Sequence, residues 1–212
     1  MPSGIVKGLQ AMNAPGNDDL LLNALLTTLE DHILPLTQQG VSRGNKIFGA
    51  ALLKKDDFSV VLAETNNETE NPLWHGEIHT LKRFSEQPAP GRPSTKDLIF
   101  LSTHEPCPMC LSAITWAGFD NFYSFFTHED SRDAFGIPHD LKILKEVFGL
   151  NPGKYRRKNA FWQSRFIRDM IAVSDETVRS HFEARAAAIT DEYACLSTLY
   201  QQDKHQNAIP LN

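Results

Sequence analysis

Cys107 and Cys110 stand three positions apart in residues 103–110 (THEPCPMC). This stretch follows a predicted strand and opens a predicted helix, and a helix N-terminus stabilises thiolates through its partial positive charge and free N–H groups. Two cysteines in this setting are typical of a redox pair like that of thioredoxin, or of half of a metal site. Taken alone, the spacing leaves both interpretations open.

A second polar group lies in residues 72–79 (PLWHGEIH), where His75 and Glu77 are two positions apart. An α-helix turns by about 100° per residue, so side chains two apart point to nearly opposite faces and no amphipathic stripe requires both. Pro72 and Gly76 indicate that a helix begins here. A histidine and a carboxylate at the start of a helix serve either chemistry or capping.

His75, Cys107 and Cys110 together make three ligands, the number that a catalytic zinc site takes from the protein while one position stays open for water. A structural zinc module would need a fourth protein ligand and would not depend on Glu77. The histidines near enough in sequence to be that ligand are His79, His104 and His128.

The motifs His75-Gly-Glu77 and residues 106–110 (PCPMC) resemble the H-x-E and P-C-x-x-C signature of the cytidine deaminase superfamily of zinc-dependent nucleobase and nucleoside deaminases. The predicted strands and helices also fit this family from about residue 46 to residue 130. The resemblance implies one Zn²⁺ per chain, held by His75, Cys107 and Cys110. Zinc lowers the pKa of bound water from about 15.7 to about 7, so that hydroxide attacks the amine-bearing ring carbon while Glu77 transfers protons.

Within the superfamily the motifs are most similar to bacterial guanine deaminases and tRNA adenosine deaminases, and residues 106–117 (PCPMCLSAITWA) resemble the guanine deaminases most. The resemblance therefore implies an aminohydrolase that removes the amine of a nucleobase, with guanine as the expected substrate. The alternatives are a cytosine, cytidine or other nucleoside deaminase, and a deaminase that edits adenosine in tRNA or another polynucleotide. A structural zinc module is the alternative that is not an enzyme.

Four residues are expected to contact the base because they match positions that do so in these relatives. Asn66 follows the second predicted strand and would hold the base, although an asparagine also suits a turn at this place. Trp116 would flank a purine and Phe48 would form a wall of the pocket, while both also suit a hydrophobic core. Asp130 roughly matches a carboxylate that contacts guanine.

The alternation of predicted strands and helices is typical of an α/β protein. We expect a three-layer α/β/α sandwich around a mixed central sheet, as in cytidine deaminases, with a helical C-terminal extension. Strands are predicted at residues 48–54 and 59–65, which form an antiparallel hairpin, and at 97–102 and 121–126, which form a βαβ unit around a helix at 106–117. The other helices are predicted at residues 18–38 with a kink near Pro35, 75–85, 138–148, 159–172 and, after a Ser174-Asp175 cap, up to about 200.

These elements divide the chain into an N-terminal tail (1–17), a zinc-dependent deaminase domain (18–150) and a helical extension (151–212) that packs on the domain or on a dimer partner. C-terminal segments in this superfamily often close the site or build a dimer, so a homodimer is expected. Two residues depart from the family pattern. Trp74 is bulky where relatives have a small residue before the histidine ligand, and Gly76 replaces a common alanine.

The 212 residues carry 21 Lys and Arg against 26 Asp and Glu, a formal net charge of −5, which disfavours a protein that wraps nucleic acid. The basic run Lys154, Arg156, Arg157 and Lys158 is interpreted as a solvated face, though it keeps the polynucleotide alternative open. No stretch has the length and hydropathy of a signal peptide or membrane span, so we expect a cytoplasmic protein that binds a small nucleobase or nucleoside. Cys195 falls on a helical apolar pattern that predicts a packed thiol.

Overall fold

The computed structural model describes residues 15–150 and 155–211 of the chain. A five-stranded sheet lies at its centre, with the strands in the order β2-β1-β3-β4-β5. β1 (Gly49–Lys54) is antiparallel to both β2 (Val60–Thr65) and β3 (Leu98–His104), whereas β3, β4 (Asn121–Phe126) and β5 (Gln163–Phe166) are parallel. The predicted hairpin and the predicted parallel βαβ unit are both confirmed.

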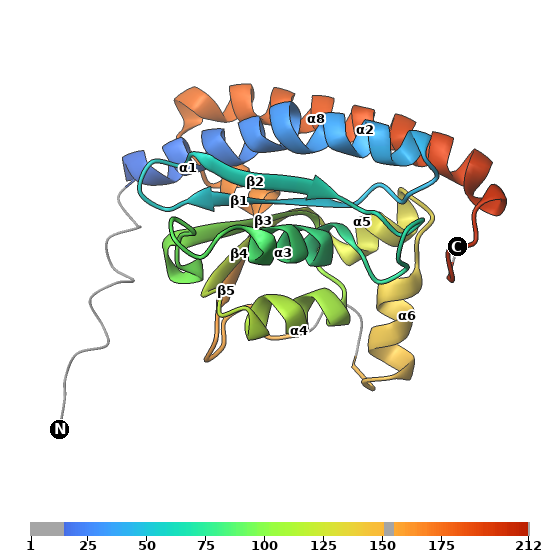
Figure 1. Ribbon diagram of the computed structural model, residues 1–212. Helices are drawn as coiled ribbons and strands as arrows, with labels where there is room; N and C mark the ends of the chain where they lie inside the picture. The colour runs from blue at the N-terminus through green and yellow to red at the C-terminus, as the bar shows by residue number, and fades with distance from the viewer. Residues whose placement is uncertain (1–14, 151–154, 212) are drawn as a thin grey trace.

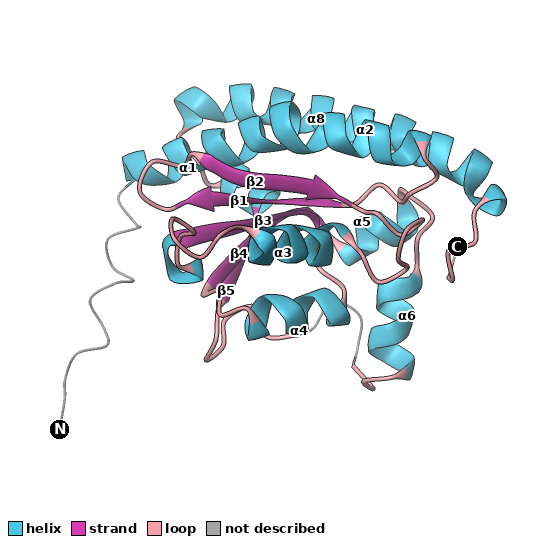
Figure 2. Cartoon of the chain, in the orientation of Figure 1, coloured by secondary structure: helices cyan, strands magenta, loops and turns pink. Residues whose placement is uncertain are grey.

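Helices cover both faces of this mixed sheet, which confirms the predicted three-layer sandwich (Figure 1). One face carries the N-terminal helical segment and the C-terminal helix, and the other carries the two helices that begin at the sequence motifs, as Figure 2 also shows. The first layer consists of α1 (Pro15–Thr27), a π-helical stretch (Thr28–Ile33), α2 (Leu34–Ser42) and α8 (Glu176–Asp203). The other layer contains α3 (Gly76–Glu86) and α4 (Pro108–Trp116). The shorter elements are α5 (His128–Asp133), α6 (His139–Glu146), α7 (Ile167–Ala172) and 3₁₀ turns at Thr95–Asp97 and Lys204–Gln206.

Side chains alternate across the sheet and build a hydrophobic core on each face. In β1, Ala51 and Leu53 belong to the core under α1 and α8, whereas Ala50 and Leu52 belong to the core under α3 and α4. All four side chains are fully buried. Because apolar layers hold β1 from both sides, the strand is a rigid support for the start of α3, which packs against it.

Residues 159–172 differ from the prediction of one helix, because they contain strand β5 followed by the short helix α7. Gln163 pairs with Asn121 and Phe166 pairs with Ser124, in parallel with β4. The exposed edge of β4 supplies backbone hydrogen bonds that the local sequence does not reveal, and strand formation depends strongly on such context. The predicted boundary at residues 150 and 151 falls at the edge of the described residues and stays a prediction.

The N-terminal helical segment continues to Ser42 rather than ending near residue 38. Pro35 lies in the first turn of α2, directly after the π-helical stretch. Proline lacks an N–H and its ring crowds the preceding turn, so a locally wider helix before it is expected. The predicted kink near Pro35 thus corresponds to a change of helix type at this position.

Among the helices of the described residues, none has the length and hydropathy needed to span a membrane.

Cys195 is exposed, so the predicted packed thiol is wrong. The buried face of α8 carries Tyr193, Leu196 and Tyr200, which recur at helical spacing. Cys195 lies two positions after Tyr193 and therefore points almost to the opposite side of the helix.

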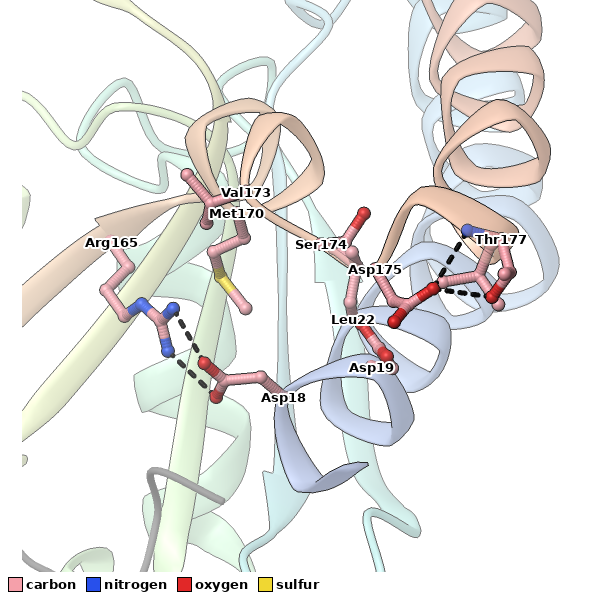
Figure 3. A pocket seen from close by; sticks show the side chains of 10 residues that line it. Asp18, Asp19, Leu22, Arg165, Met170, Val173, Ser174, Asp175 and Thr177 are labelled. Atoms are coloured by element: carbon pink, nitrogen blue, oxygen red, sulfur yellow. Dashed lines mark hydrogen bonds and ion pairs between the residues drawn. The ribbon is translucent and has the colours of Figure 1, made fainter. Parts of the chain in front are cut away.

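The first turn of α1 is tied to the edge strand β5 by an ion pair (Figure 3). Two nitrogens of the Arg165 guanidinium donate hydrogen bonds of 3.1 Å to the Asp18 carboxylate. The pair lines a surface pocket of about 600 Å³ that also includes Val173 and Asp175. None of the residues lining this pocket belongs to the groups predicted to do chemistry.

Candidate metal centre and active site

The three predicted metal ligands come together at the starts of two helices. His75 is the N-cap residue of α3, Cys107 is the N-cap residue of α4, and Cys110 lies in the first turn of α4. The Nδ1 atom of His75 lies 3.6 Å from the Cys107 Sγ and 3.8 Å from the Cys110 Sγ. Within residues 15–150 and 155–211, this is the one group of three or more His, Cys, Asp or Glu side chains that could hold a metal ion.

The donor set fits zinc in both chemistry and spacing. Zinc binds Cys sulfur at about 2.3 Å and His nitrogen at about 2.0–2.1 Å, which at a tetrahedral angle places nitrogen and sulfur about 3.6 Å apart. The distances from His75 to Cys107 and Cys110 match this value. The three side chains would therefore need little rearrangement to hold the ion.

The other nearby histidines are engaged elsewhere, so the centre has three protein ligands in the described chain. The Nδ1 of His79 lies 2.9 Å from the Thr65 carbonyl oxygen. His104 is buried among aromatic rings, and the Nε2 of His128 lies 3.2 Å from the Pro106 carbonyl oxygen. Three ligands are typical of catalytic rather than structural zinc sites.

The electrostatics of the centre favour a thiolate. A hydrogen bond from Cys110, together with His75, holds the pKa of Cys107 well below its usual range. Burial raises the pKa of Cys110 above its usual range. Burial opposes the charged form of His75, but the neighbouring Cys107 outweighs it and raises the pKa of His75 to about 9. A thiolate is the form of cysteine that binds metals.

Glu77 lies in the first turn of α3 and is buried, with 4% of its surface exposed. Burial raises the pKa of its carboxyl group, and the negative charge at Cys107 raises it further. The Ser102 hydroxyl oxygen of β3 lies 2.8 Å from Glu77 Oε1. His75 at the cap and Glu77 in the first turn therefore serve one centre, although they are only two positions apart.

Gly76 brings the start of α3 against the start of β1. A Cβ atom on Gly76 would lie 2.6 Å from the Cα of Gly49 and 2.9 Å from its nitrogen. These are backbone atoms of a buried strand, which cannot move aside as a flexible side chain would. This close approach accounts for the glycine at position 76.

We expect the Gly76→Ala protein to be less stable by about 1–3 kcal/mol, the usual cost of overpacking. The added methyl group pushes the start of α3 away from β1, and with it both His75 and Glu77. Urea denaturation measures the loss, with the exposed residue Ser85 of the same helix replaced by alanine as the control. Equal stability of the wild-type and Gly76→Ala proteins would contradict this account of the glycine.

Asn66 and Phe48 lie beside the centre but are held by other parts of the chain. The Asn66 Oδ1 accepts a hydrogen bond from the Gly76 N–H, and its Nδ2 donates one of 2.6 Å to Glu68 Oε2. The second hydrogen of the Asn66 amide makes no hydrogen bond among the described residues. Phe48 is buried in the core and meets the ring of His104 edge to face, with 4.6 Å between the ring centroids.

Trp116 and Asp130 are not brought to the centre. Trp116 is the last residue of α4 and is 91% exposed, whereas the cysteines lie at the other end of this helix. Asp130 caps α5, where its Oδ2 accepts hydrogen bonds from the Thr127 N–H at 2.8 Å and from Arg168 at 2.9 Å. The short helix α5 was not predicted from the sequence. Capping of this helix accounts for Asp130, which the sequence suggested as a contact of the base.

Asp140, in the first turn of α6, is a further carboxylate near the centre, and sequence reasoning missed it. Burial and the negative charge at Cys107 raise its pKa to about 7, while His128 and His75 oppose this shift. No hydrogen bond holds its side chain within the described residues. A signal was present, since Asp140 begins the helix predicted at 138–148, ten residues after Asp130.

Glu105 anchors the loop that carries Cys107. Its Oε1 accepts a hydrogen bond of 2.5 Å from the Tyr155 hydroxyl, and its Oε2 accepts one of 3.1 Å from the His128 N–H. The Arg157 guanidinium lies 3.7 Å from the same carboxylate. The segment after residue 154 thus braces the metal centre.

This bracing accounts for part of the basic run. Arg157 lies over the ring of Phe166, with 4.0 Å to the centroid, although its side chain is 41% exposed. Arg156 and Lys158 are exposed, and Lys154 lies outside the described residues. The described residues of the run agree with the solvated face expected from the sequence, with Arg157 also contacting Glu105 and Phe166.

A mixed sheet that presents one histidine, two cysteines and a buried glutamate at the starts of two helices defines a zinc-dependent hydrolytic deaminase. Residues 28–125 match the family described as the cytidine and deoxycytidylate deaminase zinc-binding region. Over 115 residues the chain is 32% identical to guanine deaminase from Bacillus subtilis (strain 168). The aligned region covers 53% of this chain and 70% of that protein. The chain belongs to the cytidine and deoxycytidylate deaminase family.

Solved structures share the fold. A mutant of NE0047 in complex with 8-azaguanine has a TM-score of 0.50 at 18% identity, over 92% of this chain and 99% of that chain. The guanine deaminase from Nitrosomonas europaea has a TM-score of 0.48 at 18% identity, over 80% of this chain and 84% of that chain.

Proposed function

We propose that the protein hydrolyses the exocyclic amine of guanine, using one Zn²⁺ per chain held by His75, Cys107 and Cys110. The observation that carries the proposal is the buried Glu77 carboxyl group beside three convergent ligands. The similarity to the guanine deaminase of Bacillus subtilis supports guanine as the substrate. In the reaction water adds to the amine-bearing carbon, and the carbon–nitrogen bond breaks to release ammonia.

Zinc supplies a Lewis acid that lowers the pKa of water at the site. Glu77 would take one proton from the water and pass it to a ring nitrogen, and would then take the proton of the added hydroxyl group and deliver it to the departing amine. The raised pKa of Glu77 suits these roles because the group takes up a proton more readily than an ordinary carboxylate does. A carboxylate with an ordinary, lower pKa would be a weaker base and would take up the proton from water less readily.

Ser102 stabilises Glu77 in both protonation states. Its hydroxyl oxygen lies 2.8 Å from Glu77 Oε1 and 2.6 Å from the His104 carbonyl oxygen. A hydroxyl group has one hydrogen to donate and lone pairs to accept. Ser102 can therefore donate to ionised Glu77, or donate to His104 while accepting the proton of neutral Glu77.

The proposal assigns the recognition of the base to Asp140, Asn66 and Phe48. Guanine carries N–H donors beside its exocyclic amine, and a carboxylate such as Asp140 is a suitable acceptor for them. The free amide hydrogen of Asn66 would donate to an acceptor atom of the ring, and Phe48 would limit the pocket from the core side. Trp116 and Asp130 are left out of this assignment.

We also propose a homodimer in which Trp116 is covered by the partner. A tryptophan that is 91% exposed on a folded helix is unusual, because aromatic side chains gain most from burial. Leu73, which is 59% exposed just before α3, adds to the exposed apolar surface. A cytoplasmic location stays a prediction from the sequence.

Ammonia release from a panel of bases tests the proposed substrate. The zinc-loaded protein is supplied with guanine, adenine, cytosine and their nucleosides. We expect guanine to give the highest kcat/KM of the panel. A cytosine compound as the best substrate would overturn the assignment of guanine, and silence across the panel would direct the search to polynucleotides.

A further inference from the structure

The two ring nitrogens of His75 face different groups. Nδ1 points to the two sulfurs, at 3.6 Å from Cys107 and 3.8 Å from Cys110. Nε2 lies on the other side of the ring, 3.6 Å from the Oε1 of Glu68. Because Nδ1 is the atom placed to bind a metal, Nε2 is the atom that carries the hydrogen of a neutral imidazole.

Glu68 is a buried carboxylate with partners on every side. Its Oε1 accepts a hydrogen bond of 2.8 Å from the Lys46 ammonium group, and its Oε2 accepts one of 2.6 Å from the Asn66 amide. Only 3% of Glu68 and 5% of Lys46 are exposed. The Asn66 oxygen in turn accepts from the Gly76 N–H at the start of α3.

Such a pair is costly to bury. Removing an ammonium and a carboxylate from water is rarely recovered by their attraction alone, and an apolar pair of similar volume is often as stable or more so. Glu68 and Lys46 stand 22 residues apart, in the loops before β1 and after β2, so no local element requires their pairing. The pair lies beside Nε2 of His75, the ring nitrogen that does not face the sulfurs, and this location suggests a role in positioning the ring.

We infer that Glu68, held by Lys46 and Asn66, is a positioning residue that accepts a hydrogen bond from His75 Nε2–H and presents Nδ1 to the zinc ion. Histidines that bind metals commonly donate their other ring hydrogen to a carboxylate, which fixes the tautomer and the ring orientation. The separation of 3.6 Å is a few tenths of an ångström longer than a hydrogen bond. The inference rests on the proposed function only in taking zinc as the metal.

Lys46 has a separate task in this arrangement. A carboxylate that is buried without a partner is costly. The ammonium group of Lys46 lies 2.8 Å from Glu68 Oε1, so it compensates the buried charge and helps to fix the position of the carboxylate. Lys46 and Asn66 together hold Glu68 beside the His75 ring.

The zinc dissociation constant of the Glu68→Gln protein tests the inference. The apoprotein is titrated with zinc in competition with a chromophoric chelator. Loss of an outer partner of a metal ligand costs about 10- to 100-fold in affinity, and we expect a loss of this size. Equal zinc affinity of the wild-type and Glu68→Gln proteins, or no zinc binding by the wild type, would overturn the inference.

Glu64→Gln is the matched control, because Glu64 is the acidic neighbour of a histidine outside the centre. Its Oε2 lies 3.5 Å from Nδ1 of His79, one turn along α3 from His75. We expect this protein to bind zinc as tightly as the wild type. A comparable loss of zinc affinity in both variants would mean that replacing any glutamate near α3 has this effect. That outcome would contradict a specific role for Glu68.

A double variant separates positioning from stability. Lys46→Met combined with Glu68→Leu removes both buried charges together, so we expect it to fold at least as stably as Glu68→Gln and to retain weak zinc binding. It also replaces Glu68→Gln in the titration should that protein fail to fold. Recovery of full zinc affinity in the double variant would show that the pair acts only on folding.

The zinc titration and the substrate panel fail independently. Tight zinc binding that depends on Glu68, without turnover of guanine, would reject the proposed substrate and leave the role of Glu68 intact. Turnover of guanine, together with equal zinc affinity of the wild-type and Glu68→Gln proteins, would reject the positioning role alone.

Discussion

The Glu77→Gln protein should bind zinc as the wild type does and lose deaminase turnover by about 10²- to 10⁴-fold, the usual contribution of a general acid–base group. Glutamine has the shape of glutamate and can still hydrogen-bond to Ser102, whose hydroxyl oxygen lies 2.8 Å from the present carboxylate. It cannot take up or return a proton near neutral pH. The three metal ligands are untouched, so elemental analysis should find the same zinc content while ammonia release falls.

Glu86→Gln is the control for this substitution. Glu86 ends the same helix, is exposed, and accepts a hydrogen bond of 2.6 Å from Lys82, far from the ligands along α3. We expect wild-type turnover from it. Undiminished turnover in Glu77→Gln would place the proton transfer on another group and reject the mechanism.

The Cys107→Ser protein should fold and lose its zinc. Cys107 is the N-cap residue of α4, where its Sγ accepts a hydrogen bond of 3.5 Å from the Cys110 N–H. Serine is among the best N-cap residues, so the helix keeps its cap. The hydroxyl group does not ionise at neutral pH and therefore cannot replace the thiolate as a ligand.

Losing a direct ligand should weaken zinc binding more than the about 10- to 100-fold expected when an outer partner is lost. Dialysis followed by elemental analysis measures the remaining metal, and circular dichroism verifies the fold. Cys195→Ser, which changes the exposed cysteine of α8, should retain one zinc per chain. Full zinc content in Cys107→Ser would mean that another side chain takes its place.

The chemistry of this protein was largely determined by its sequence, because each motif is local. His75 and Glu77 share one helical turn, and Cys107 and Cys110 share another, so residue types and spacing define two half-sites without knowledge of the fold. The hairpin and the βαβ unit that carry these half-sites were also predictable. Their strands have strong apolar patterns, and their connections have clear turn and capping residues.

The base-contacting residues were less predictable, because their roles depend on which surfaces face the centre. Asp130 and Asp140 both precede or begin helical segments and look alike in sequence. Only packing assigns Asp130 to the cap of α5 and turns Asp140 toward the ligands. Trp116 shows the same limit, since a residue of an amphipathic helix can face the core, a pocket or a partner.

Strand β5 and the Lys46–Glu68 pair were decided by the tertiary structure alone. β5 forms because β4 offers an open edge to a short segment that is 42 residues later, Gln163 beside Asn121. Lys46 and Glu68 meet because the loops at the ends of two antiparallel strands converge on the start of α3. Sequence periodicity reports neighbours within a turn or a strand, whereas these contacts join segments through the folded chain, where burial raises the cost of every unpaired charge.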